Sequence, residues 1–371
     1  MTTDTSVKYF DSSMSGAPAL SNTAGTLVSV LDACLVNGFG SMTLTSLVIA
    51  GNVATAIKTG HGFVMRGNTG PVIVISGATP AELNTEFRIQ SIPDANTFTF
   101  ATSGIADQTA TGTISAKRAP AGFSKVFSGT NKGAYQSNDI TGTQLFLRVD
   151  DTTTTYARMR GYEDIANQTA FDGDTATGPY PTDEQLSGGG YLFKVNGTGT
   201  RKWTLFCDGR IFYFFDDPYV TGEWYGGICF GDPQSHYAVD PFCCILVATT
   251  AATSPTYLFQ LGVSSGGYIA RNSSMTGLSV VLGKYSHGRS TQMGYNYTTF
   301  NYDFLSFWPV EVWDSSVAPR GMMPGLWNPI SSTLPHGLVI NGIAQLPGRT
   351  LITQRMSVSY CCAIDITGPW R

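Results

Sequence analysis

Residues 51–116 decide the fold class, because their turns and strands read Gly51-Asn52-Val53-Ala54-Thr55-Ala56, His61-Gly62-Phe63, Ile75-Ser76-Gly77-Ala78-Thr79-Pro80, Thr97-Phe98-Thr99-Phe100 and Ala110-Thr111-Gly112-Thr113-Ile114. Apolar side chains alternate at Val72 and Val74 and again at Phe98 and Phe100, as in strands with one buried face. Asp94-Ala95-Asn96 separates two such runs and predicts a hairpin turn. We therefore expect short β-strands joined by Gly, Pro and Asn turns.

On either side of this stretch the chain divides into further parts. A length of 371 residues exceeds what one hydrophobic core usually organises. We expect an N-terminal arm with one short helix over residues 1–43 and a small all-β, barrel-like module over residues 44–118. Residues 119–371 are expected to form a large antiparallel, β-sandwich-like domain. The predicted fold class is mostly β.

The N-terminal part contains the one helix that the sequence predicts. Residues 1–21 alternate loosely and indicate an extended arm, and residues 21–23 offer N-cap side chains. Apolar residues at positions 27, 28, 31, 34 and 35 then recur at helical spacing as far as Asn37-Gly38. An arm with an amphipathic helix often anchors a subunit to its neighbour, so Leu27, Leu31 and Leu35 are candidate subunit contacts. A helix that simply caps its own domain fits the same pattern.

Strand-like runs continue through the C-terminal part, at residues 144–149, 155–162, 191–194, 203–207, 210–215, 242–249, 278–282 and 356–366. Asp208-Gly209 lies between two alternating runs and predicts a hairpin with a type I′ turn. Residues 169–190 are rich in turn-forming residues and predict a long exposed loop. Aromatic runs towards the end need a deep core or a partner surface. The candidate subunit contacts there are Trp308, Trp313, Trp327 and Trp370.

The composition indicates which kinds of molecule the protein binds. Charged residues make up only 13% of the chain and aromatic residues 12%. Interface cores are depleted in charge and enriched in Tyr, Trp and Phe, so this composition suits a protein packed against other subunits. An ordinary β-rich extracellular domain fits it as well. A net charge of −4, without a Lys or Arg cluster, argues against a nucleic-acid groove.

The N-terminus shows no secretory signal. Met1-Thr2-Thr3-Asp4-Thr5-Ser6 lacks a basic start, and no apolar run follows it. No stretch approaches the roughly 20 apolar residues that a membrane helix needs. The sequence therefore predicts synthesis in the cytoplasm of the producing cell and no membrane insertion.

The seven cysteines favour buried, reduced thiols over a metal site. They show no C-x-x-C spacing, and His236, the histidine nearest to any of them, lies seven residues from both Cys229 and Cys243. The Gly-rich stretches lead into strand-like runs, whereas a phosphate-binding loop leads into a helix. No metal or cofactor is predicted.

The sequence contains three pairs of adjacent carboxylates that are candidates for a catalytic acid and base, namely Asp150-Asp151, Asp183-Glu184 and Asp216-Asp217. A polysaccharide hydrolase needs two carboxyl groups that face one cleft. Neighbouring residues on a strand point to opposite faces, so each pair is expected to mark a strand end or a loop. No catalytic residue is predicted, and the protein is not expected to be an enzyme.

Several motifs resemble those of tailed-bacteriophage and prophage proteins. The stretch over residues 51–116 resembles a small all-β module of phage virion and tail proteins. The opening Lys8-Tyr9-Phe10, the run Arg320-Gly321-Met322-Met323-Pro324-Gly325-Leu326-Trp327-Asn328-Pro329 and the end Asp365-Ile366-Thr367-Gly368-Pro369-Trp370-Arg371 resemble signatures of a virion structural protein family whose role is poorly defined.

The resemblance implies a structural component of a virion, made in the host bacterial cytoplasm. It further implies a symmetric homo-oligomer that contacts other phage virion proteins in the tail or neck or on the capsid. An alternative is a host-surface glycan-binding module of the tail tip, in which exposed Tyr and Trp side chains stack on sugar rings. A virion-associated polysaccharide depolymerase is the third alternative.

Overall fold

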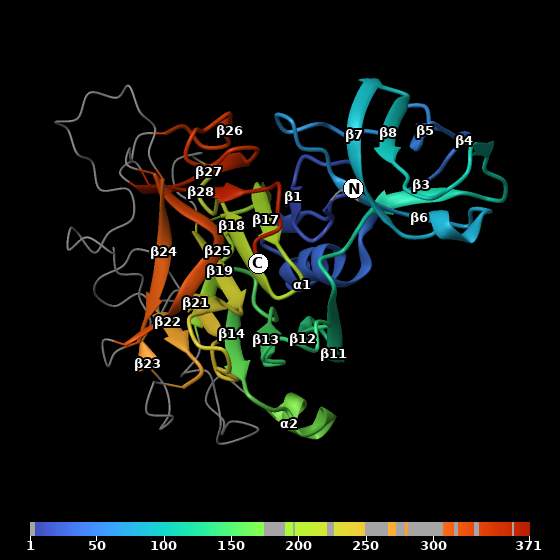
Figure 1. Cartoon of the computed structure of the whole chain (residues 1–371). Helices are drawn as coiled ribbons and strands as arrows, with labels where there is room; N and C mark the ends of the chain where they lie inside the picture. The colour runs from blue at the N-terminus through green and yellow to red at the C-terminus, as the bar shows by residue number, and fades with distance from the viewer. Residues whose placement is uncertain are drawn as a thin grey trace.

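The computed structural model describes residues 4–173, 190–195, 197–220, 226–248, 266–271, 279–280, 307–314, 318–329, 334–357 and 360–371. Within these residues the chain is mostly β, with antiparallel sheets, as the sequence predicts. A small lobe built from β3 to β10 projects from a larger body (Figure 1). We call this lobe the small module and the remainder the body. Among the described residues, no helix is long and apolar enough to cross a membrane.

The small module is one curved sheet with two free ends. Its elements are β3 (Phe39–Thr43), β4 (Ser46–Ala50), β5 (Val53–Ile57), β6 (Val72–Ser76), the 3-10 helix η2 (Ala81–Leu83), β7 (Glu86–Asp94), β8 (Thr97–Ala101), β9 (Gln108–Thr109) and β10 (Ser115–Arg118). The strand order is β3-β10-β6-β7-β8-β5-β4-β9, so the described strands do not close into the expected barrel. The sheet begins at Phe39, a few residues before the expected boundary at residue 44.

The core of the small module confirms part of the predicted strand pattern. Phe98 and Phe100 are completely buried, and Asp94 pairs with Thr97 across the predicted hairpin turn. On β6, however, the core residues are Ile73 and Ile75. The expected alternation at Val72 and Val74 was therefore one residue out of register, because every residue from 72 to 75 is apolar and either face fits the pattern.

The body consists of three main sheets. The five-stranded sheet contains β11 (Phe123–Gly129), β12 (Lys132–Ser137), β13 (Phe146–Asp150), β14 (Tyr156–Tyr162) and β15 (Gly190–Phe193). The seven-stranded sheet contains β1 (Lys8–Asp11), β17 (Trp203–Cys207), β18 (Ile211–Asp216), β19 (Gly226–Gly231), β21 (Ile245–Ala248), β22 (Gly266–Ile269) and β23 (Ser279–Val280). The six-stranded sheet contains β20 (Gln234–Ser235), β24 (Phe307–Trp313), β25 (Pro319–Pro329), β26 (Val339–Asn341), β27 (Thr350–Ser357) and β28 (Tyr360–Asp365).

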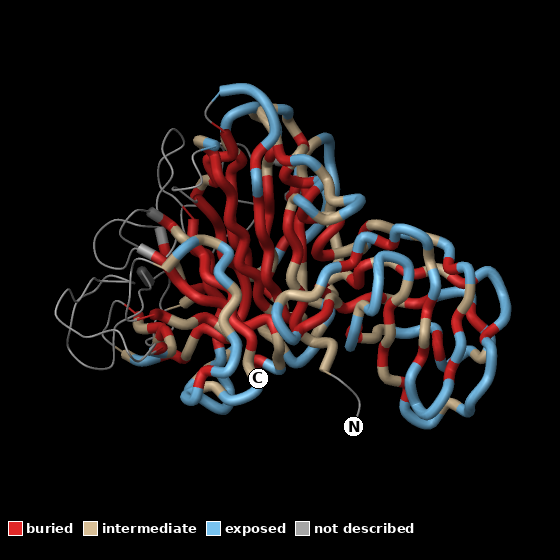
Figure 2. The backbone as a smooth tube through the Cα atoms, turned by 90° about the horizontal axis from the view of Figure 1, so that it is seen from above, coloured by how far each residue is buried: buried red, intermediate tan, exposed pale blue. Residues whose placement is uncertain are grey.

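The seven-stranded sheet forms the middle layer of the body. On β18, Phe212 and Phe214 face a core shared with the five-stranded sheet, whereas Tyr213 and Phe215 face a second core shared with the six-stranded sheet. Both faces are covered, and all six residues of β18 are therefore buried. Buried segments concentrate in these strands, while exposed ones lie in the turns around them and in the small module (Figure 2). The aromatic side chains of β18 are thus buried inside the chain, whereas most of the aromatic run expected over residues 295–309 lies outside the described residues.

The predicted hairpin between β17 and β18 is present, but its turn is of another type. Cys207 pairs with Phe212, and the turn residues Gly209 and Arg210 both keep a negative φ, which a type I′ turn does not allow. The Asp208 carboxylate holds the turn by accepting hydrogen bonds from the backbone N–H groups of Arg210 at 2.8 Å and Ile211 at 2.9 Å.

Two other predicted segments change in the structure. The expected strand over residues 356–366 is two antiparallel strands, since β27 ends at Ser357 and β28 begins at Tyr360. The expected loop over residues 169–190 begins with a short helix, α2 (Gln168–Gly173), and residues 174–189 lie outside the described residues.

The N-terminal segment is extended, as predicted, but it is bound to its own chain. β1 is the edge strand of the seven-stranded sheet, where Lys8 pairs with Cys207. A second short strand, β2 (Leu20–Ser21), pairs with β16 (Thr200–Arg201). Val7 is completely buried. Anchoring a neighbouring subunit through β1 would first require breaking these pairs.

Candidate functional site

The predicted helix exists, and its apolar face lies inside the body. It consists of α1 (Thr26–Leu31) followed by the π-helical turn η1 (Asp32–Asn37). Leu27, Leu31 and Leu35 are each 0% exposed and belong to the core between the five- and seven-stranded sheets. Contact with another subunit through these leucines would require them to leave that core.

The cap of this helix comes from far along the chain. The predicted N-cap side chains at residues 21–23 are not used, and Gly25 occupies the N-cap position with a left-handed φ of 83°. Instead, the Asp151 carboxylate accepts a hydrogen bond from the Leu27 N–H at 2.8 Å and forms a completely buried ion pair with Lys194. Burial raises the pKa of Asp151, while the ammonium group of Lys194 opposes this shift.

Three of the four candidate tryptophans lie on one hairpin, but at different positions along it. Trp308, Trp313 and Trp327 lie on the hairpin formed by β24 and β25, and Trp308 is 39% exposed. Trp370 is 8% exposed, and its indole N–H donates to the Asp365 carbonyl oxygen at 2.9 Å. Trp370 is thus occupied inside the chain, whereas the subunit-contact role of the other three stays a prediction.

Two of the three carboxylate pairs lie at strand ends, as predicted. Asp150 ends β13 and forms ion pairs with Lys132 and Arg148, while Asp151 is held by Lys194. Asp216 ends β18, and the pair Asp183-Glu184 lies outside the described residues. The first pair is engaged in holding the fold together and offers no cleft-facing acid and base.

Asp216 is an unusual buried carboxyl group. It is 0% exposed, and neither of its carboxyl oxygens has a hydrogen-bond partner among the described residues. Burial, and then the neighbouring charge of Asp217, raise the pKa of Asp216 well above its ordinary value. Burial therefore favours the neutral, protonated form of this carboxyl group.

Replacing Asp216 by asparagine is expected to stabilise the protein at neutral pH. Because the folded-state pKa of Asp216 lies above the unfolded value, its favourable contribution is complete in acid and is lost as pH rises. Below the unfolded-state pKa, the free energy of unfolding of D216N should equal that of the wild type. Above it, the free energy of unfolding of D216N should be the larger, by about 1.4 kcal/mol for each unit of pKa shift. Urea unfolding across pH measures this. The control is D107N, at an exposed position, whose stability should depend on pH as that of the wild type does. If D216N and the wild type were equally stable at neutral pH, the raised pKa of Asp216 would be contradicted.

All seven cysteines are buried, as the sequence predicts. Burial raises the pKa of each thiol, for example that of Cys243 to about 12. Such thiols are poor nucleophiles and poor metal ligands. Among the described residues, no three His, Cys, Asp or Glu side chains are placed to hold a metal ion.

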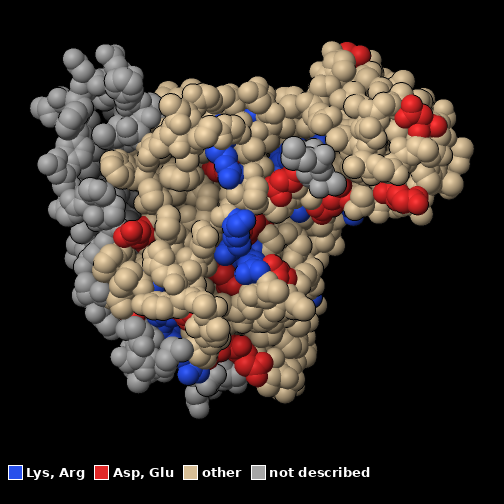
Figure 3. Space-filling model, in the orientation of Figure 1, with Lys and Arg blue, Asp and Glu red and all other residues tan. Residues whose placement is uncertain are grey.

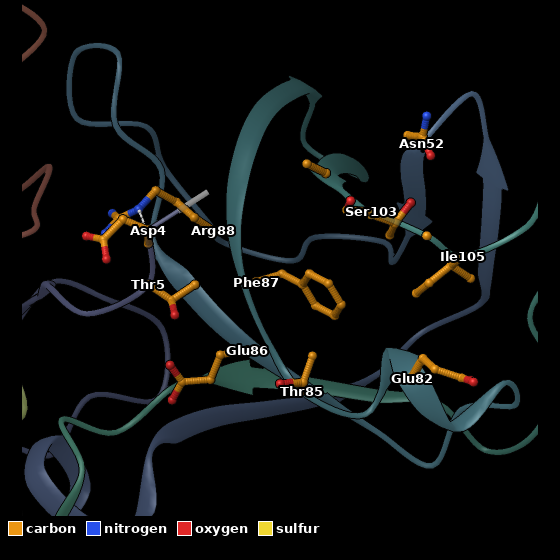
Figure 4. Close-up of a pocket in the computed structure, with 13 residues that line it drawn as sticks. Asp4, Thr5, Asn52, Glu82, Thr85, Glu86, Phe87, Arg88, Ser103 and Ile105 are labelled. Carbon is orange, nitrogen blue, oxygen red and sulfur yellow. Dashed lines mark hydrogen bonds between the residues drawn. The ribbon is translucent and has the colours of Figure 1, made fainter. Parts of the chain in front are cut away.

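A cavity in the small module is one candidate for a ligand site. Its volume is about 780 Å³, and it lies where β8 separates from β7. β7 pairs with β6 over Glu86–Arg88 but joins β8 only from Ile89 onward, so the chain after β8 diverges and leaves an opening. The N-terminal segment, at Asp4 and Thr5, borders the opening on the other side of β7 (Figure 4).

The cavity has an aromatic wall with polar groups around it. Phe87 is backed by Phe100, whose ring centroid lies 4.5 Å away, and points towards Ile105 (Figure 4). Glu82, on η2, lies on the same side of β7 as Phe87 and is exposed. Asn52 and Ser103 stand at the far rim. This arrangement offers one apolar surface and several hydrogen-bonding groups.

Arg88 lines the cavity, but its guanidinium group is fully engaged. It donates to the carbonyl oxygens of Asp4 at 2.8 Å, Val7 at 2.8 Å, Gly70 at 3.0 Å and Ile366 at 3.4 Å. These four carbonyls belong to the N-terminal segment, the small module and the end of β28. Arg88 therefore joins the small module to the body and is not available to bind an anion.

Sequence reasoning missed this cavity. Its walls come from residues 4–5, 52, 82, 85–88 and 101–105, which meet only in the folded sheet. Glu82 and Phe87 each have an ordinary local explanation, as a helical surface residue and as a strand residue.

A scan of protein-family models and a search of curated proteins both gave no match to this chain.

Proposed function

We propose that the protein is a structural component of a tailed-bacteriophage virion that assembles as a symmetric multimer in the tail or neck or on the capsid. The resemblance of its motifs to phage proteins supports this proposal, as does its low content of charge. The observation that carries it is Trp308 on β24, which is 39% exposed in the hairpin of β24 and β25.

The position of this hairpin suits a subunit contact. Among the described strands, β24 pairs with β25 alone and so lies at the edge of the sheet. Partly exposed tryptophans are the side chains that most often dominate binding at protein interfaces. Charged side chains are sparse on the face shown in Figure 3, where they lie near the middle, on the small module and along the lower part of the body. Such surfaces can be buried against other subunits with little cost of desolvating charge.

Substituting Trp308 is expected to weaken the assembly. If Trp308 anchors the contact, W308S should raise the dissociation constant of the multimer by tenfold or more, since central tryptophans contribute about 2 kcal/mol or more. Light scattering over a concentration series and incorporation into particles measure this. The matched control is Y237S, at a tyrosine that is 49% exposed on another loop. Equal behaviour of the two variants would contradict the assigned contact.

Labelling of particles tests the location independently. An antibody against the body, used in immunogold electron microscopy of purified phage, should label a ring or tip of the tail, the neck, or the whole head. Each of these patterns identifies a virion component and says where it lies. Absence of label on particles, with the protein present in infected cells, would overturn the proposal.

A second candidate is host-surface glycan binding, which the cavity in the small module favours. Its volume of about 780 Å³ and its mixture of aromatic and polar walls suit a sugar ring. A depolymerase receives no such support, because Asp150 and Asp151 are engaged in ion pairs and Asp216 is completely buried. Direct binding of oligosaccharides to the purified protein tests the second candidate.

A further inference from the structure

We propose that the side chains of Lys194 and Asp151 become joined by an amide bond, an intramolecular cross-link that forms once the chain has folded. This inference goes beyond the proposed function and does not depend on it. It is argued from the burial of the pair, from the groups that hold the Lys194 amine and from the backbone N–H groups that hold the Asp151 carboxylate.

The two side chains meet in a site that is closed to solvent. Both are 0% exposed, and Nζ of Lys194 directly contacts Oδ1 of Asp151. Two charges that leave water lose hydration free energy, which their mutual attraction returns only in part. A neutral amide avoids this cost, and its formation releases a water molecule to the solvent. The burial of the pair therefore favours the amide, whereas in water the separate charged groups are favoured.

The acceptors around Lys194 orient its nitrogen for attack. Besides Asp151, the backbone carbonyl oxygens of Thr153 and Thr23 accept hydrogen bonds from Nζ, at 3.0 Å and 3.3 Å. When one proton of the ammonium group passes to Asp151, the two N–H bonds that remain are held by these two carbonyl oxygens. The lone pair of the nitrogen then points at the carboxyl group, which is the alignment that bond formation requires.

The other oxygen of Asp151 faces the first turn of α1. The Leu27 N–H donates to Oδ2 at 2.8 Å, and the Val28 N–H is a further donor to this carboxylate. Attack on the carboxyl carbon places negative charge on the oxygen that stays, and backbone N–H groups aimed at that oxygen stabilise the charge. The geometry thus makes Oδ1 the leaving oxygen and Oδ2 the oxygen of the amide.

The step is balanced and needs no oxidant, reductant or co-reactant. Nζ of Lys194 gives one proton to Oδ1 of Asp151 and attacks Cγ, so that the Nζ–Cγ bond forms. A second proton passes from Nζ to Oδ1, the Cγ–Oδ1 bond breaks, and Oδ1 leaves as water. The amide keeps one N–H group. Because Asp151 directly follows β13 and Lys194 directly follows β15, the bond ties the ends of these two strands together.

Mass spectrometry of the purified full chain, denatured before measurement, tests the bond. We expect a mass that is lower, by one water molecule, than the mass calculated from the sequence. Trypsin cleaves after Lys and Arg but not after an acylated Lys, so a branched peptide of residues 149–158 and 161–201 should appear. Its fragmentation should place the branch at Asp151 and Lys194. Lys194→Arg keeps the positive charge without the primary amine and should have its full calculated mass.

The control is Lys132→Met, at a lysine that forms an ion pair with Asp150 at 3.4 Å but is 24% exposed. This variant should still lack one water, and Lys132 of the wild type should carry a free amine. A wild-type chain of full calculated mass would overturn the proposal. A water loss that persists in Lys194→Arg would overturn it too, since the loss would then lie elsewhere, for example in an imide at Asp208-Gly209.

Discussion

Replacing Lys194 by methionine is expected to lower the free energy of unfolding by about 3–5 kcal/mol. The Lys194 side chain is 0% exposed and neutralises Asp151, which is also 0% exposed. Its ammonium group also donates to the carbonyl oxygens of Thr153 at 3.0 Å and Thr23 at 3.3 Å. K194M leaves a buried carboxylate without its counter-charge at the start of α1. Urea unfolding monitored by tryptophan fluorescence measures the loss.

The pH dependence of this variant separates a charge effect from a packing effect. Loss of Lys194 removes the charge that opposes the burial-induced rise in the pKa of Asp151. The folded-state pKa is then raised further, so the deficit of K194M should be largest at neutral pH and shrink in acid, where Asp151 is protonated. K132M is the control, because Lys132 lies 3.4 Å from Asp150 and is 24% exposed. It should lose no more than about 1 kcal/mol. A deficit of K194M that is equal at every pH would contradict this account.

Replacing Arg88 by methionine should separate the small module from the body. The variant leaves the carbonyl oxygens of Val7, Gly70 and Ile366 without their donor in a buried site. Each unpaired buried group costs about 1 kcal/mol or more, so the expected loss is about 2–4 kcal/mol. Hydrogen exchange should rise first in residues 4–7 and 364–367, before the core of the module opens.

The matched control for Arg88 lies on the same module. Lys117 donates to the Asn37 carbonyl oxygen at 2.6 Å, but this bond is exposed to solvent. K117M should therefore stay within about 0.5 kcal/mol of the wild type. If R88M and K117M were equally stable, with unchanged exchange in residues 4–7, Arg88 would not be the connection that holds the module in place.

Local features of this fold were accessible from the sequence, because their determinants are adjacent residues. Both predicted hairpins formed, at Asp94-Ala95-Asn96 and at Asp208-Gly209, since turn-forming side chains act on their own backbone. The type of the second turn was missed, because the Asp208 carboxylate, and not a positive φ at Gly209, stabilises it. β25 was also missed, since its three prolines and two glycines argue against a strand.

Features that depend on distant residues were not accessible. The helix cap at Leu27 comes from Asp151, which lies 124 residues away, so no local sequence pattern predicts it. The three-layered body was not predicted, although the continuous apolar run of β18 is the pattern of a strand that is covered on both faces. The cavity likewise depends on four segments that the folded sheet brings together. Its acidic and aromatic residues have no common spacing in the chain.

The pairing of β1 with β17 also sets the order of events during synthesis. The ribosome completes Lys8 early, yet the atom that its carbonyl oxygen contacts, the Cys207 thiol, follows 199 residues later. At about 5–20 residues per second, the nascent N-terminus must wait roughly 10–40 s for its partner strand. During that interval the side chains that are buried in the folded protein, among them Val7 and Phe10, are exposed to other proteins in the cell. The first strand to be made therefore cannot pair until β17 has been made, and chaperone capture of nascent chains should concentrate on it before then.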